Sequence, residues 1–181
     1  MKVVVADDDA ALLTRLSKAI TGIECNGNVE VCGEAYNGAE LIDIVESQSP
    51  VDLIITDIRM PVMDGLSALV YLKKKYQALK IVLLSSESVK KLRAETGEVD
   101  LEDAKKMGLL EKIAARIRSG DTDNGKINSM LEGCEKLAMD PIAVAEHFGA
   151  VGFVSKPITV AKMTQLLEEL KSATSFVYIG I

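Results

Sequence analysis

The stretch VDLIITDIRMPVMDG, residues 51–65, is the part of this chain from which its architecture can be read. It opens with a short apolar run, residues 53–55, which is too brief for a helix and follows Pro50. Such a run predicts a strand that is buried on both faces. One carboxylate, Asp57, comes directly after the run, and the chain then turns through MPVMDG. Open α/β sheets bind ligands at the carboxyl ends of their strands, although an acid in this position is also an ordinary turn former.

Length and composition set the first bounds. A chain of 181 residues and 19.5 kDa fits one domain with a sizeable core. With 21 basic and 27 acidic residues, it has no broad basic surface for nucleic acid, so we expect no direct DNA binding. The three cysteines have no CxxC spacing and suit reduced thiols. The chain opens without the apolar segment of a signal peptide and has no run of membrane-spanning length, so we expect a cytoplasmic protein.

Strand-like and helix-like segments alternate along much of the chain. Five apolar runs predict strands, at residues 2–6, 29–35, 53–55, 81–84 and 151–154. Apolar residues at helical spacing follow each run, the last set ending near Leu170. Strict alternation requires a parallel sheet whose two faces are covered by right-handed crossovers. We therefore predict a flavodoxin-like, doubly wound α/β fold with five strands in the order 2-1-3-4-5.

The alternation is interrupted after Ser86. Residues 87–139 are too many for a structureless loop within a compact domain, and they contain two apolar stripes separated by SGDTDNG. We expect a helical insertion between the fourth strand and the fourth helix, within a single domain of residues 1–181. The simpler expectation is that these stripes pack on each other and on the domain. The alternative is that part of their surface contacts a partner or a second copy of the chain. The apolar tail, residues 175–181, adds an edge strand, docks on the body or contacts a neighbour, and the sequence does not choose.

Polar side chains follow four of the predicted strands, at the edge where the carboxyl ends of parallel strands meet. They are Asp7, Asp8, Asp57, Ser85 and Lys156. Crowded carboxylates repel one another unless a cation is present, and Mg²⁺ prefers such oxygen ligands. Asp57 could then attack a phosphoryl group, with Lys156 and Ser85 holding the phosphoryl oxygens. The sequence thus predicts a magnesium and phosphoryl site at this edge.

These residues carry a family resemblance. The chain resembles the receiver domain of two-component response regulators and is similar to the single-domain chemotaxis regulators. The resemblance covers residues 1–86 and 140–172. The matching features are the acidic pair Asp7-Asp8, the phosphoacceptor loop DIRMPVMDG, the Ser/Thr switch Ser85, the aromatic switch Phe153, and Lys156 followed by a usually cis proline, Pro157.

The resemblance implies a role for each matched residue. It implies that Asp57 is phosphorylated by a sensor histidine kinase or a phosphotransfer protein. It implies Mg²⁺ binding by Asp7, by Asp8, by Asp57 and by the backbone carbonyl of Arg59, with Asp7 acting through water. It further implies that phosphorylation switches a protein-binding surface through Ser85, Phe153 and Pro157, so that a downstream protein is the target. Partner identity does not carry over, because the segment after Ser85 is much longer than in most receivers.

Two alternatives to a phosphoacceptor receiver remain open, a phosphatase and a scaffold. We expect no enzyme beyond the domain's own phosphoryl transfer and autodephosphorylation. A haloacid-dehalogenase-type phosphatase uses similar residues, but it needs a second acid two residues after the nucleophile, where this chain has Arg59. A degenerate receiver would act as a phosphorylation-independent scaffold. A homodimer through the insertion or the tail would be compatible with either form of receiver.

Overall fold

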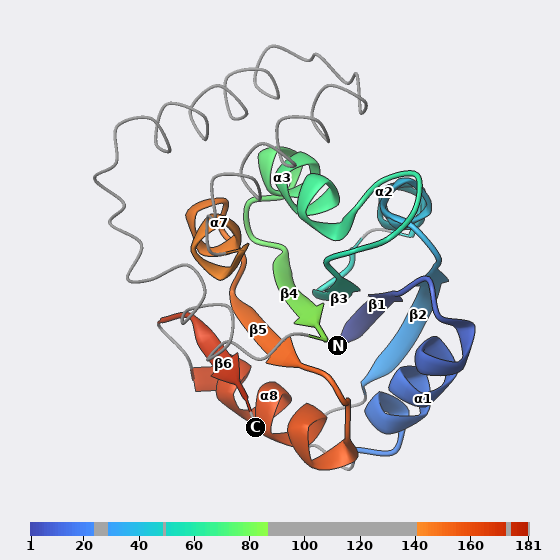
Figure 1. Ribbon diagram of the computed structural model, residues 1–181, viewed down its shortest axis with the longest axis vertical. Coiled ribbons are helices and arrows are strands. Elements are labelled where there is room, and N and C mark those ends of the chain that lie inside the picture. The colour runs from blue at the N-terminus through green and yellow to red at the C-terminus, as the bar shows by residue number, and fades with distance from the viewer. Residues whose placement is uncertain (24–28, 49, 87–140, 173–174, 181) are drawn as a thin grey trace.

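The computed structural model describes residues 1–23, 29–48, 50–86, 141–172 and 175–180. The described residues form a parallel sheet of six strands in the order β2-β1-β3-β4-β5-β6, with helices on both faces (Figure 1). This is the predicted flavodoxin-like arrangement with one additional strand. The predicted helical insertion, residues 87–139, lies outside the described residues.

Each predicted strand is present to within two residues at either end. The strands are β1 (Lys2–Ala6), β2 (Glu30–Ala35), β3 (Leu53–Asp57), β4 (Lys80–Ser85), β5 (Gly152–Ser155) and β6 (Val177–Ile179). The described helices are α1 (Ala10–Thr21), α2 (Gly38–Ser47), α3 (Gly65–Lys75), α7 (Pro141–His147) and α8 (Val160–Ser172). The central strand β3 is buried along its whole length, as expected for a strand covered on both faces.

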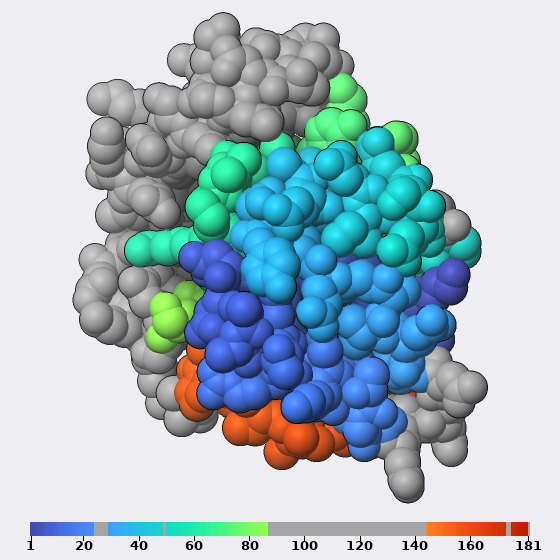
Figure 2. All heavy atoms as spheres, turned by 90° about the vertical axis from the view of Figure 1, so that its right-hand side faces the viewer, coloured from blue at the N-terminus to red at the C-terminus, as the bar shows by residue number. Residues whose placement is uncertain are grey.

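Two apolar layers enclose the sheet. One layer packs α2, α3 and α7 on one face, and its strand side chains include Val4, Ile54 and Ile81. The other packs α1 and α8 on the opposite face, against Val5, Ile55 and other strand residues. Alternate residues of one strand serve opposite layers because successive side chains point to opposite faces. Figure 2 views the molecule from the side of β2, where residues from β1 to α2, blue to cyan, make up much of the visible surface.

The helices after β1, β2 and β3 begin at polar caps. Asp9 caps α1 by accepting hydrogen bonds from the backbone N–H groups of Ala11 and Leu12. Asn37 caps α2 and Asp64 caps α3 in the same manner. These caps lie at the carboxyl edge of the sheet, so this edge contains acids with structural roles beside the predicted site residues.

The prediction of five strands was one strand short. The tail forms β6, which pairs in parallel with β5, so that the edge-strand alternative is the one found. Val177 and Ile179 are buried in the layer of α1 and α8, whereas the ring of Tyr178 stacks on Phe153 at 5.8 Å between centroids. The three residues are β-prone but make too short a run to form a strand by themselves, and the unpaired edge of β5 gives them a partner.

Among the described residues, no helix is both long and apolar enough to cross a membrane.

Candidate functional site

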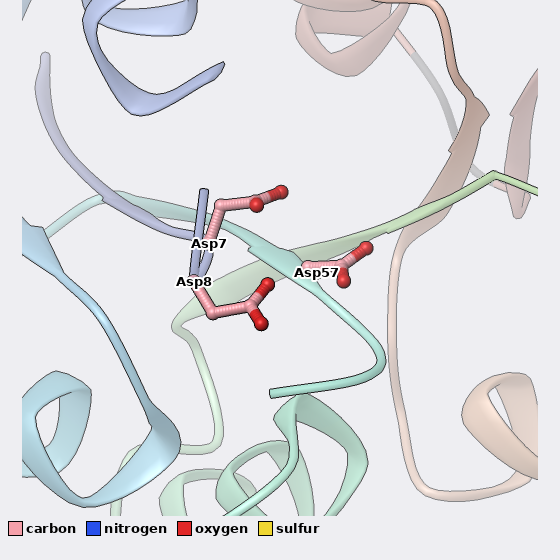
Figure 3. A group of neighbouring side chains, drawn as sticks. All are labelled: Asp7, Asp8 and Asp57. Carbon is pink, nitrogen blue, oxygen red and sulfur yellow. The ribbon is translucent and has the colours of Figure 1, made fainter. Parts of the chain in front are cut away.

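The strand register gathers the predicted site residues at one edge. Asp7 and Asp8 directly follow β1, which pairs with β3 up to Ala6 and Thr56. Asp57 ends β3, and it pairs with Leu84, the residue before Ser85. Figure 3 shows the three carboxylates projecting from the ends of two neighbouring strands toward the same space.

The three acids form a cluster suited to a cation. Carboxylate oxygens of Asp7, Asp8 and Asp57 lie within 4.8 Å of one another. Asp7 is 1% exposed and Asp57 is 8% exposed, whereas Asp8 is open to solvent. The donors are all oxygen, with one accessible side left for water, which is the set that Mg²⁺ accepts.

Lys156 reaches across the edge of the sheet to two of these acids. Its ammonium lies 2.7 Å from Asp7 Oδ2 and 2.9 Å from Asp57 Oδ1. Burial alone would lower the pKa of Lys156, but the hydrogen bonds to Asp7 and Asp57 outweigh it and raise the pKa. Lys156 therefore stays charged at neutral pH. The following peptide bond, Lys156–Pro157, is cis.

Burial has the opposite consequence for Asp57. Desolvation raises the pKa of the Asp57 carboxyl, and the negative charges of Asp7 and Asp8 raise it further. The Lys156 ammonium lowers it, but not by enough to reverse the direction. Ionised Asp57 is thus destabilised in the folded protein, and additional positive charge at the cluster would favour the carboxylate.

The backbone around Asp57 is fixed by contacts that the sequence did not reveal. A Cβ on Gly65 would lie 2.0 Å from the carbonyl oxygen of Asp57, so only glycine allows this approach. The same carbonyl accepts a hydrogen bond from Thr56 Oγ1 at 3.1 Å. Asp7 is held in a comparable way, because the backbone N–H of Asp9 donates to Asp7 Oδ1 at 3.0 Å. The dipeptide Asp64-Gly65 signalled a turn, but the close approach depends on the fold.

The other predicted residues lie around this cluster. Ser85 ends β4, and its carbonyl accepts a hydrogen bond from the backbone N–H of Lys156 at 2.7 Å. Arg59 is exposed in the loop that follows Asp57. Phe153 is fully buried on β5, facing the layer of α2, α3 and α7. Lys156 therefore contacts the acid cluster directly, whereas Phe153 packs in the apolar core.

The fold and the clustered strand ends are those of a receiver module, and comparison with known families agrees. The model of the family described as "Response regulator receiver domain" matches residues 3–118. The chain belongs to this family. Receivers are modules of two-component signalling in which an aspartyl phosphate and Mg²⁺ are standard features.

Curated relatives contain this module within longer chains. A protein-glutamate methylesterase/protein-glutamine glutaminase of Rhodospirillum centenum is 33% identical over 145 residues, which cover 68% of this chain and 36% of the relative. The DNA-binding transcriptional regulator NtrC of Escherichia coli is 34% identical over 84 residues, covering 46% of this chain and 17% of the relative. The matched region thus spans well under half of either relative.

Solved structures show the same fold at low sequence identity. The isolated receiver domain of RcsB from Salmonella enterica serovar Typhimurium, in the presence of the phosphomimetic BeF₃⁻, superposes with a TM-score of 0.60 at 19% identity. The match covers 98% of this chain and 92% of that one. The response regulator domain of CheB from Thermotoga maritima gives a TM-score of 0.58 at 22% identity and covers 96% and 95% of the two chains.

Proposed function

We propose that this chain is a phosphoacceptor receiver, in which Asp57 takes a phosphoryl group from the phosphohistidine of a sensor histidine kinase or phosphotransfer protein. The observation that carries the proposal is the position of Lys156, whose ammonium contacts both Asp57 and Asp7 beside a third carboxylate, Asp8. An ammonium held by two acids at a strand end fits the neutralisation of phosphoryl oxygens.

The transfer is a substitution at phosphorus. A carboxylate oxygen of Asp57 attacks, the P–N bond to the donor histidine breaks, and its electron pair leaves with the imidazole nitrogen. Lys156 remains beside Asp57 as a fixed positive charge, and the Ser85 hydroxyl donates to a phosphoryl oxygen. Because ionised Asp57 is destabilised by burial, converting it to an acyl phosphate, which is a mixed anhydride, removes the carboxylate charge and places negative charge on the phosphoryl oxygens instead.

Asp7, Asp8, Asp57 and the carbonyl of Arg59 would hold Mg²⁺. The oxygen-only donors and their spacing fit this ion, and three carboxylates against one ammonium leave a negative excess for a divalent cation to balance. When bound, the ion supplies positive charge that offsets the repulsion between the carboxylates and an incoming phosphoryl group. Asp7 would contribute through a water molecule, as the resemblance to receivers implies.

The output is a change in a protein-binding surface. Ser85, Phe153 and Pro157 act as the switch. A downstream protein in the cytoplasm is the target, and a homodimer through the insertion or the tail is one form the output can take. Direct DNA binding is not part of the proposal, because the chain has a net charge of −6.

The test is incubation with a small phosphodonor, acetyl phosphate, and MgCl₂, followed by intact mass measurement. One phosphate should be added to the native protein and none to Asp57→Asn. Asp43→Asn, which changes an exposed acid on α2, is the matched control and should be phosphorylated normally. An unchanged mass for the native protein would overturn the proposal.

We further propose that the chain is not an enzyme acting on other substrates. The phosphatase alternative needs an acid two residues after Asp57, and that residue is Arg59, on the exposed loop. Purified protein should therefore show no sustained turnover of p-nitrophenyl phosphate with MgCl₂. Multiple turnovers that disappear in Asp57→Asn would reverse this conclusion.

A further inference from the structure

Lys162 makes a contact next to the phosphoacceptor site, with Ser155 and not with the acids of the site. This residue lies in the first turn of α8, and its ammonium is directed at the end of β5. It donates to the backbone carbonyl of Ser155 at 2.6 Å and to Ser155 Oγ at 3.2 Å. Ser155 is 1% exposed, so the contact is to a buried strand end.

The contact completes the hydrogen bonding of one peptide unit. The peptide that joins Ser155 to Lys156 donates its N–H to the carbonyl of Ser85 on β4 at 2.7 Å. Pairing with β6 ends one residue earlier, at Val154, so the Ser155 carbonyl lies beyond the last β6 partner in that register. Lys162 supplies the donor instead. Both polar ends of this peptide are thereby fixed, one to β4 and the other to α8.

The charge of Lys162 is unfavourable for its own helix. Cations are destabilising near a helix N-terminus, where the backbone N–H groups give a partial positive charge, and the first turn of α8 contains no acid to compensate. Thr159 caps the same turn by accepting from the backbone N–H of Lys162 at 3.2 Å. A residue that opposes its local preference is expected where it serves another part of the molecule.

We propose that Lys162 is a positioning residue for Lys156. Lys162 fixes the peptide that precedes Lys156. It thereby holds the Lys156 backbone in the position from which the side chain contacts Asp7 and Asp57. Lys162 itself touches neither acid in the contacts described. The proposed benefit for phosphoryl transfer rests on the function proposed above, whereas the positioning of the backbone does not.

The positioning is tested without phosphodonor or metal, by NMR hydrogen exchange of the Lys156 backbone amide. Lys162→Met keeps the aliphatic stem and removes the ammonium, and exchange at Lys156 should accelerate about tenfold, as for the loss of a hydrogen bond to a charged donor. Lys171→Met removes an exposed charge from the last turn of the same helix and should leave this amide unchanged. If Lys162→Met does not fold, Lys162→Gln retains a neutral donor and should give a smaller acceleration.

The contribution to transfer is tested by a double-mutant cycle on the rate of phosphorylation by acetyl phosphate. Lys162→Met should slow the native protein about tenfold, because small misplacements of a positioned group reduce rates strongly. In a Lys156→Met background the same change should alter the rate by less than about twofold, since the group being positioned is gone. A merely structural role would reduce both backgrounds equally.

The outcomes separate the two proposals. Unchanged exchange at Lys156 in Lys162→Met would overturn the positioning role, as would an equal loss of rate in both backgrounds. Failure of the native protein to accept phosphate would instead overturn the proposed function. In that case accelerated exchange at Lys156 would still support the positioning of the backbone by Lys162.

Discussion

The interior of the sheet and its carboxyl edge meet within a single strand, β3. Ile54 and Ile55 are fully buried, and each belongs to one of the two apolar layers. Asp57, two residues further on, is nearly as buried but carries a carboxylate whose pKa is raised by that burial. Burial stabilises the fold at the first two positions and opposes ionisation at the third. Exclusion from water therefore has opposite energetic consequences for apolar and ionisable side chains.

The largest effect on stability should come from truncating a side chain in the core of the sheet. Ile55→Ala removes three methyl or methylene carbons from a position with no exposed surface and should lower the free energy of unfolding by about 2–5 kcal/mol. Urea denaturation followed by circular dichroism measures this. Val160→Ala, at a side chain 56% exposed, should change stability by less than about 0.5 kcal/mol. Similar losses for the two variants would contradict the assigned packing.

The next largest effect on stability should come from Mg²⁺ binding to the acid cluster at the carboxyl edge of the sheet. If the acid cluster binds Mg²⁺ only in the folded state, MgCl₂ at a hundred times the dissociation constant should add about 2.7 kcal/mol to the free energy of unfolding. Asp8→Asn removes an exposed member of the cluster and should abolish most of the gain. Asp43→Asn, on α2, should retain it. Equal gains in all three proteins would place the bound ion elsewhere.

A smaller effect should appear as a pH dependence in metal-free buffer. Because the pKa of Asp57 is raised by folding, the folded protein holds this proton more tightly than the unfolded chain. Native stability relative to Asp57→Asn should therefore be highest below the unfolded pKa of about 3.9 and fall as pH rises through the folded pKa. Denaturation midpoints of both proteins between pH 3 and pH 8 measure the difference. A native protein that gained on the variant with rising pH would show that the Lys156 ion pair outweighs burial.

The smallest effect should come from Asp9, which caps α1 at the same edge of the sheet as the proposed site but is not a member of the acid cluster. Asp9→Ala removes the cap of α1 and should cost about 1 kcal/mol of stability. Phosphorylation should persist, because Asp9 contacts Asp7 through its backbone N–H, which the variant keeps. Asp9→Asn preserves a capping oxygen and should be close to native in stability. Loss of phosphate acceptance in Asp9→Ala alone would assign its carboxylate to the site.

Much of the edge could be anticipated because parallel strands place their carboxyl ends together. Once Asp7, Asp57 and Ser85 were each assigned to the end of a strand, their proximity followed from topology, without any contact being known. The buried central strand could be predicted equally well, since Leu53 to Ile55 form an uninterrupted apolar run. The sixth strand was left among several alternatives, because VYI is β-prone but short, and its pairing depends on the edge of β5.

The sequence by itself determined the alternation of strands and helices, the parallel sheet that this alternation requires, and which polar residues reach the carboxyl edge. These follow from local periodicity and from the handedness of chain connections. Only the tertiary structure decided that Lys156 bridges Asp7 and Asp57, that Gly65 admits no side chain beside Asp57, and that Lys162 fixes the peptide before Lys156. Such contacts join residues from different elements, and their distances depend on how whole layers pack rather than on any local pattern.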